Sequence, residues 1–302
     1  MPELWIPLTF AAAFFQNLRS ALQKHLKSRL STAGAAYVRF FYAWPFAVVY
    51  CWALARFGGF AVPEPNPKFL LYCFLGGLSQ IIFTFLLLWL FSFRNFAVGT
   101  TYSKTETAQV AILGLLILGD TLSVTAVVAI AVSLVGVFAL SVVDARITVK
   151  NLFTGLAEKP TLIGLVCGAF LGASVVLFRG GALALGNDDF LMRAAFTLAV
   201  SVVMQTLMMG GYLLWREPGQ MTAVVRNWRP ALSVGVAGVL ASIFWFSAFT
   251  LENAALVRAV GQIELVFTFI ASAVFFRERT KMVELVGIAL IVGGILILVL
   301  GR

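Results

Sequence analysis

Charged side chains are scarce in this sequence. Asp, Glu, Lys and Arg make up 12% of the 302 residues, whereas hydrophobic residues make up 61%. Because a soluble domain averages about 25% charged residues, this composition favours lipid as the solvent. Apolar runs of about 20 residues recur along the chain, and a helix of that length crosses a hydrocarbon core. The sequence therefore predicts an all-α polytopic membrane protein.

The residues of metal and disulfide chemistry are also few. The three cysteines, Cys51, Cys73 and Cys167, stand singly inside apolar runs, where cysteine behaves as a small hydrophobic residue. The one histidine, His25, has no partner motif. The sequence contains no HExxH or GxSxG pattern and no GxxxxGK[ST] phosphate loop. We therefore expect no metal site, no cofactor and no ATP coupling, and no enzymatic activity.

The net charge of +9 comes from basic residues that lie mostly in short loops between the apolar runs. In such loops, Lys and Arg set the membrane topology and contact lipid phosphates. Since no basic face or aromatic platform module accompanies them, we expect no nucleic-acid partner. The first ten residues, MPELWIPLTF, carry an acid and no basic segment. The first apolar run is therefore expected to be a helix of the mature protein and not a signal peptide.

Ten apolar runs bounded by charge, glycine or proline are candidate transmembrane helices. They cover residues 5–24, 36–56, 69–91, 97–118, 122–142, 162–185, 189–214, 230–250, 254–276 and 282–300. We expect a first five-helix repeat over 1–143, a polar linker over 144–161 and a second five-helix repeat over 162–302.

The two halves match in register when the first is shifted by 158 residues. This shift aligns polar residues without a gap, in the pairs Asn95 and Asn253, Glu106 and Glu264, and Asp120 and Glu278, followed by Gly136 and Gly294. A slightly different shift aligns Arg39 with Arg193. Because each repeat has an odd number of helices, the second copy is expected to run through the membrane inverted. Such inverted repeats place a binding site near the midplane and suit alternating access.

These features together resemble the ten-helix EamA-like branch of the drug/metabolite transporter superfamily. The resemblance is carried by the five-plus-five arrangement, by an Arg that opens the second helix of each half, and by apolar helices that run into LGDTLS and FRERTK. The "GERLS"-like turn of that family corresponds to residues 119–123 and 277–281. The resemblance implies a secondary transporter, often an exporter, of amino acids or similar metabolites. Members often carry Pro where this chain has Thr107 and Leu265, each preceded by Glu, so the substrates of those members are not carried over.

Glu106 and Glu264 are the central candidates for a site. Each lies about ten residues into a predicted helix, where an ionised group costs at least ~2.5–3.5 kcal/mol. One interpretation is a buried ion pair that fixes helix packing; the other is binding of an amine or a proton. Lys104 points away from Glu106 along the same helix. A partner for Glu106 must therefore come from another helix, with Arg19, Arg39, Arg193 and Arg258 as candidates.

Further polar residues fall on faces that could line a cavity. Tyr102 and Gln109 share the face of Glu106, while Arg258 and Gln262 form a second polar stripe beside Glu264. The remaining candidates in predicted helices are Asn17, Arg19, Gln80 and Trp245. Hydrogen bonding between helices is the alternative for the polar members, and core packing is the alternative for Trp245. Arg39 and Arg193 can either capture an anion or reach the interface.

The sequence thus favours a secondary transporter of a small organic solute, working by alternating access and directed towards export, in the plasma membrane or bacterial inner membrane. The expected partners are the solute, membrane lipid and, as a coupling ion, protons. A non-transporting scaffold or receptor is the alternative, and an intramembrane enzyme is a weaker one. Basic loops place both termini outside by the positive-inside rule, whereas the family resemblance implies cytoplasmic termini. The sequence sets neither the substrate nor the oligomeric state.

Overall fold

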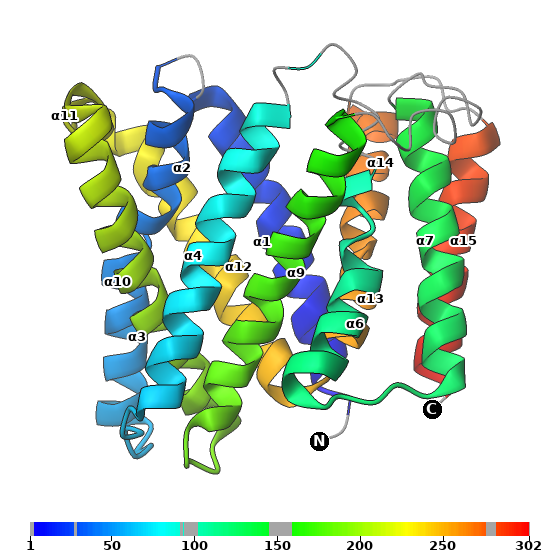
Figure 1. The fold of residues 1–302 in the computed structure, drawn as a ribbon, viewed down its shortest axis with the longest axis horizontal. Coiled ribbons are helices and arrows are strands. Elements are labelled where there is room, and N and C mark those ends of the chain that lie inside the picture. The colour runs from blue at the N-terminus through cyan, green and yellow to red at the C-terminus, as the bar shows by residue number, and fades with distance from the viewer. Residues whose placement is uncertain are drawn as a thin grey trace. The chain divides into compact units, whose positions relative to one another are not determined.

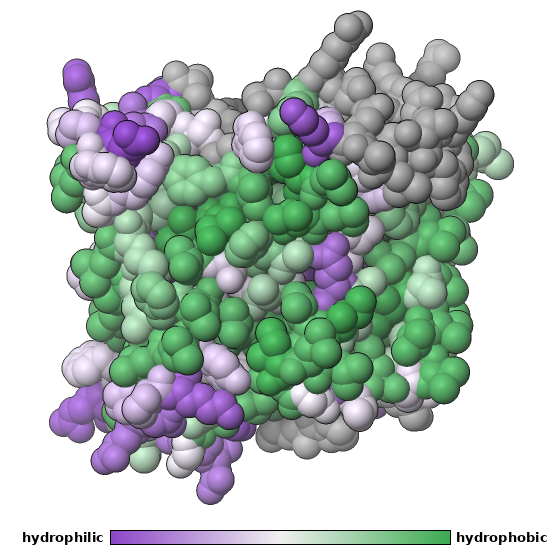
Figure 2. All heavy atoms as spheres, in the orientation of Figure 1, coloured by the Kyte–Doolittle hydropathy of each residue, from purple (hydrophilic) through white to green (hydrophobic). Residues whose placement is uncertain are grey.

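The fold was examined in a computed structural model, which describes residues 3–26, 29–90, 93, 102–144, 159–275 and 282–301. Every regular element in these ranges is a helix (Figure 1). On the face seen in Figure 2, apolar side chains cover most of the middle of the helices around one small hydrophilic patch, and further hydrophilic residues gather at the helix ends. The protein is therefore all-helical, as the sequence predicts.

Seven helical stretches in the described part are long and apolar enough to cross a membrane. They are Thr32–Phe57, Pro67–Leu87, Val124–Ser141, Lys159–Ala184, Phe190–Arg216, Trp228–Leu251 and Met282–Leu300. A shorter apolar helix, α6 (Glu106–Leu118), joins them. The chain is thus a multi-pass membrane protein, while the count of ten helices stays a prediction.

The chain forms two compact units, and each unit takes residues from both halves of the sequence. Unit 1 consists of Met1–Ile81 and Leu177–Glu252, and unit 2 of Ile82–Val176 and Asn253–Arg302. Two helices, α4 (Pro67–Leu90) and α9 (Lys159–Ala184), contain the divisions between the units. Most of the proposed linker over 144–161 lies outside the described residues.

The other helices fall within one unit each. Those of unit 1 are α1 (Trp5–Leu26), α2 (Thr32–Phe41), α3 (Trp44–Phe57), α10 (Phe190–Arg216), α11 (Pro218–Arg226) and α12 (Trp228–Leu251). Those of unit 2 are α6, α7 (Val124–Asp144), α13 (Ala254–Gly261), α14 (Ile263–Phe275) and α15 (Met282–Leu300). In unit 1, α1 packs along α12; in unit 2, α7 packs along α15.

Two of the predicted helices are each divided in the structure. The predicted helix 36–56 forms α2 and α3, because Pro45 near the start of α3 lacks the N–H that a continuous helix would need. The predicted helix 254–276 forms α13 and α14, which are separated at Gln262. The predicted helix 97–118 is not continuous in the structure, because a turn at Lys104 and Thr105 precedes α6, which begins at Glu106. Residues 97–101 lie outside the described part.

In unit 1, side chains cap the C-terminal ends of two helices by donating hydrogen bonds to backbone carbonyls. The guanidinium of Arg179 donates to the carbonyl oxygens of Phe249 and Glu252, both at 2.8 Å, where α12 ends. Asn66 donates to the carbonyl of Ala184, the last residue of α9, at 2.7 Å. Cations and amide donors suit these positions because the last carbonyls of a helix have no partner within it.

Glycines allow α7 and α15 of unit 2 to approach closely. A methyl group on Gly287 of α15 would lie 3.0 Å from the carbonyl oxygen of Gly136 on α7. A methyl group on Gly294 would lie 2.8 Å from the carbonyl oxygen of Ala129 and would overlap the Ser133 side chain. The space beside Gly293 is open. Small residues thus let two apolar helices pack by van der Waals contact, as is usual within membranes.

We expect Gly294→Ala to lower the free energy of unfolding by about 1–3 kcal/mol, because the added methyl group forces α7 and α15 apart. The neighbouring variant Gly293→Ala is the matched control. It should be neutral or slightly stabilising, since alanine is the better helix former. Thermal unfolding in detergent compares the two variants, and equal effects would contradict this packing.

Candidate functional site

Two interrupted helices of unit 2 define the candidate site. Lys104 and Thr105 form a turn directly before α6, and Gln262 separates α13 from α14. The 158-residue shift relates Lys104 to Gln262 and Glu106 to Glu264, so the two interruptions occupy equivalent positions in the two halves. Each glutamate consequently lies in the first turn of a helix. The apolar pattern instead predicts a position about ten residues inside a helix.

Neither interruption contains proline. At the first, both the backbone N–H and the hydroxyl of Thr105 donate to the carbonyl of Tyr102, at 3.1 and 2.7 Å. At the second, the N–H of Gln262 donates to the carbonyl of Ala259 at 3.3 Å. These bonds span three residues, as in a 3₁₀ turn, and thereby break the four-residue hydrogen-bond pattern of an α-helix.

A buried ion pair joins α13 to the start of α6. The guanidinium of Arg258 donates to the carboxylate of Glu106, and these residues are only 7% and 3% exposed. Beside them, the side-chain amide of Gln262 donates to the hydroxyl of Thr107 at 2.9 Å. The two helices pack against each other at this point (Figure 1). Of the four arginines that were candidate partners for Glu106, the structure therefore selects Arg258.

A second, looser ion pair involves the other glutamate. The ammonium of Lys104 lies 3.9 Å from a carboxylate oxygen of Glu264, which exceeds hydrogen-bond distance. The Lys104 side chain is 37% exposed and that of Glu264 is 12% exposed. The turn before α6 thus places a cation near Glu264, while α13 supplies the cation that binds Glu106.

The two glutamates occupy equivalent positions in the repeats, but their cationic partners do not. The repeat relates Lys104 to Gln262, which carries no charge, so the charge for Glu106 comes from Arg258 one turn earlier. As a result, one glutamate is held by a buried guanidinium and the other by a partly exposed ammonium. Arginine suits the buried pair, since its planar fork binds carboxylate and it stays protonated.

A model of the EamA-like transporter family matches residues 3–142 and again residues 159–300. The chain belongs to the EamA-like transporter family. The two matches follow the two halves of the sequence and give the two-repeat architecture of this family. The family indicates a membrane transporter of small solutes.

A solved structure entitled "Crystal structure of protein" has the same fold as this EamA-like chain. It is 14% identical in sequence, with a TM-score of 0.74, and the match covers 99% of this chain and 97% of that one. At this identity the likeness shows the fold alone. No curated protein matches the chain.

In this EamA-like protein, the other predicted residues of unit 2 take part in packing around the first interruption. Tyr102 is buried and faces the ring of Phe138 on α7, with the ring centroids 6.2 Å apart. Gln109 donates to the hydroxyl of Thr105 at 2.8 Å and to the carbonyl of Leu165 on α9 at 3.3 Å. Gln109 thus ties α6 to α9, and Tyr102 ties the turn to α7.

The remaining predicted residues, Asn17, Arg19, Gln80 and Trp245, belong to unit 1. The indole N–H of Trp245 donates to Gln16 at 3.0 Å, which joins α12 to α1. Gln80 accepts from Gln205 at 2.6 Å, which joins α4 to α10. Gln16 and Gln205 stand on polar positions of apolar helices, and only the structure shows which residues they contact.

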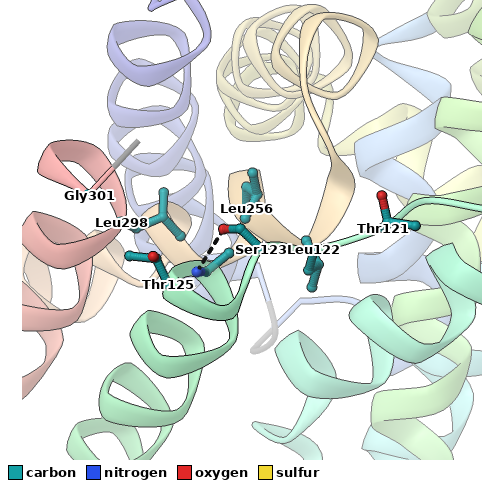
Figure 3. Close-up of a pocket in the computed structure, with 8 residues that line it drawn as sticks. Thr121, Leu122, Ser123, Thr125, Leu256, Leu298 and Gly301 are labelled. Carbon is teal, nitrogen blue, oxygen red and sulfur yellow. Dashed lines mark hydrogen bonds between the residues drawn. The ribbon is translucent and has the colours of Figure 1, made fainter.

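A small cavity of about 140 Å³ lies near the start of α7 in unit 2 (Figure 3). Its lining comes from the turn before α7, the first turn of α7, α13, α15 and the residue after α15. It comprises Thr121, Leu122, Ser123, Thr125, Ala126, Leu256, Leu298 and Gly301. The hydroxyl of Ser123 accepts the N–H of Ala126 at 3.2 Å and so caps α7. The cavity thus lies beside the capped N-terminus of α7, and no charged side chain lines it.

We expect Glu106→Gln to destabilise the protein far more than Glu264→Gln does. Removing one partner of a buried pair costs about 3–5 kcal/mol, because the other charge stays buried. A partly exposed pair at 3.9 Å contributes at most about 1 kcal/mol. Thermal unfolding in detergent gives the comparison, and the double variant Glu106→Gln/Arg258→Gln should regain part of the loss. Equal losses for the two single variants would show that their environments do not differ in this way.

Proposed function

We propose that the protein is a secondary active transporter of a small organic solute that works by alternating access. The solute class is an amino acid or similar metabolite, the direction is export, and the location is the plasma membrane or bacterial inner membrane. The observation that carries the proposal is the pair of interrupted helices at equivalent positions, each with a glutamate in its first turn. Interrupted helices in corresponding positions of two repeats typify the binding sites of secondary transporters.

We assign the partly exposed pair, Lys104 and Glu264, to ligand exchange. Their 3.9 Å separation is held by charge attraction without a direct hydrogen bond, so an incoming amine or proton can replace Lys104 beside the carboxylate at little cost. The remaining exposure of both side chains gives such a ligand access. Glu264 is therefore the proposed ligand-binding carboxylate, for the solute or for a coupling proton.

The buried pair, Arg258 and Glu106, has a different role in the proposal. Breaking it would leave a charge in a low-dielectric environment, so it stays closed while Glu264 exchanges ligands. The pair holds the end of α13 against the start of α6, and Gln262 with Thr107 extends this contact. Tyr102 and Gln109 support the same turn. Of the residues in unit 1, Asn17, Arg19, Gln80 and Trp245 stay proposed cavity residues.

The test is counterflow in proteoliposomes that are preloaded with a mixture of unlabelled amino acids and small amines. Each labelled solute is offered outside, with and without a pH gradient. We expect Glu264→Gln to reduce uptake about ten- to a hundredfold, since a lost charge-assisted contact is worth about 1.5–3 kcal/mol. The pH dependence of uptake should disappear in the same variant.

The matched control is Glu284→Gln, which removes a carboxylate from the first turn of α15 and leaves both ion pairs in place. Its uptake should equal that of the unmodified protein. Unchanged uptake and pH dependence in Glu264→Gln would overturn the assignment of Glu264. The absence of counterflow for every solute in a correctly folded protein would favour the scaffold or receptor alternative.

A further inference from the structure

The connection between α10 and α12 in unit 1 carries exposed aromatic and basic residues. Trp215 near the end of α10 is 76% exposed, and Trp228 at the start of α12 is 51% exposed. Both helices are long and apolar enough to cross a membrane, and the short helix α11 lies between them along the chain. Because indole rings favour the headgroup layer, these two positions mark the membrane surface at this end of unit 1.

An arginine stacks on each of these rings. The Cζ atom of Arg216 lies 4.8 Å from the ring centroid of Trp215. The Cζ atom of Arg229 lies 5.5 Å from the ring centroid of Trp228. Both distances fit a cation–π interaction. Stacking uses the face of a guanidinium, so its N–H edge stays available for phosphate oxygens. The two tryptophans thus hold two cations at the membrane surface.

The inner face of α11 packs against α2 (Figure 1). Val224 is fully buried, and its carbonyl oxygen accepts a hydrogen bond from the Tyr42 hydroxyl at 3.1 Å. The side-chain oxygen of Gln220 accepts the backbone N–H of Ser31, the N-cap residue of α2, at 2.8 Å. Arg226 in the last turn of α11 is exposed. The contacts to α2 therefore fix α11 in place and leave a third arginine on its outer side.

The one acid of this connection is bound to a different group. Glu217 accepts a hydrogen bond from the Ser31 hydroxyl at 2.6 Å. In the part of the chain that the structure describes, no ion pair joins Arg216, Arg226 or Arg229 to a carboxylate. Three arginines against one glutamate leave the connection with a net charge of +2. The exposed side of the connection is therefore positive.

The opposite end of α10 differs in charge. Asn187, in the turn before α10, donates to the carbonyl of Ala61 at 2.7 Å and so joins this turn to the loop between α3 and α4. The charged residues around the turn and the loop are Arg56, Glu64, Lys68, Asp188 and Asp189. Three acids against two bases leave this end slightly negative. Anionic lipid attracts bases near its surface by about 1 kcal/mol each, so it matches only the end that carries α11.

We propose that the exposed aromatic and basic residues of the α10–α12 connection form a surface that binds the headgroups of anionic phospholipids. This α11 surface comprises Trp215, Arg216, Arg226, Trp228 and Arg229. The indole rings lie at the edge of the hydrocarbon region, and the guanidinium groups bind the phosphates. The inference goes beyond the transport proposed above and does not depend on it, because lipid binding is measured without uptake.

The test uses the whole chain, delipidated in a neutral detergent. Phosphatidylglycerol or phosphatidylcholine is added at equal mole fractions, and thermal unfolding is followed. We expect phosphatidylglycerol to raise the unfolding temperature by about 2 °C or more above phosphatidylcholine. The difference should shrink at about 1 M salt, where the Debye length falls to about 3 Å. Glycerol 3-phosphate, which has a phosphate but no acyl chains, should give no such rise.

Two double variants with the same loss of charge locate the response. Arg216→Gln/Arg229→Gln should remove at least half of the rise that is specific to phosphatidylglycerol. Arg56→Gln/Lys68→Gln, at the opposite end of unit 1, is the matched control and should keep the full rise. Mass spectrometry of the retained lipid gives a readout that does not depend on stability, and the first variant should retain fewer phosphatidylglycerol molecules per protein.

Three results would overturn the proposal. One is a rise of the same size with phosphatidylcholine or with glycerol 3-phosphate. Another is a difference between the two lipids that salt does not change. The third is an equal response of the two double variants, either in unfolding temperature or in retained lipid.

Discussion

A charge that enters the hydrocarbon region must meet an opposite charge or a strong hydrogen-bonding group. This requirement accounts for the arrangement of unit 2 around Glu106 and Arg258. Their contact joins the last turn of α13 to the start of α6. It thereby holds two short helices against each other. The turn at Thr105, the amide of Gln262 and the packing of Tyr102 all surround this one ion pair.

The two units meet the requirement differently. In the described part of unit 2, Arg258 forms a buried pair with Glu106, and Lys104 forms a partly exposed pair with Glu264. Unit 1 binds the guanidinium of Arg179 to the backbone carbonyls of Phe249 and Glu252 at the end of α12. The first solution stabilises a closed contact between helices. The second satisfies helix-end carbonyls that have no partner within their helix.

Interrupted helices without proline have a particular physical consequence. The turn before α6 and the break at Gln262 are held by side-chain and backbone hydrogen bonds that a small rearrangement can replace. A proline would instead remove a donor permanently. In the absence of proline at Thr107 and Leu265, each interruption therefore depends on local hydrogen bonds and not on a missing backbone donor. Both glutamates gain from it, since the first turn of a helix favours negative charge.

The sequence by itself determined the helical class, the multi-pass membrane character and the repeat that makes Glu106 and Glu264 equivalent, because hydropathy and register are properties of neighbouring residues. It also narrowed the partner of Glu106 to four arginines. Only the tertiary structure decided that Arg258 is that partner, that Lys104 faces Glu264, and that α6 begins at Glu106. The two ion pairs depend on which helices approach each other, and the start of α6 depends on turn hydrogen bonds that the apolar pattern does not encode. The composition of the two units from both halves follows from the same long-range packing.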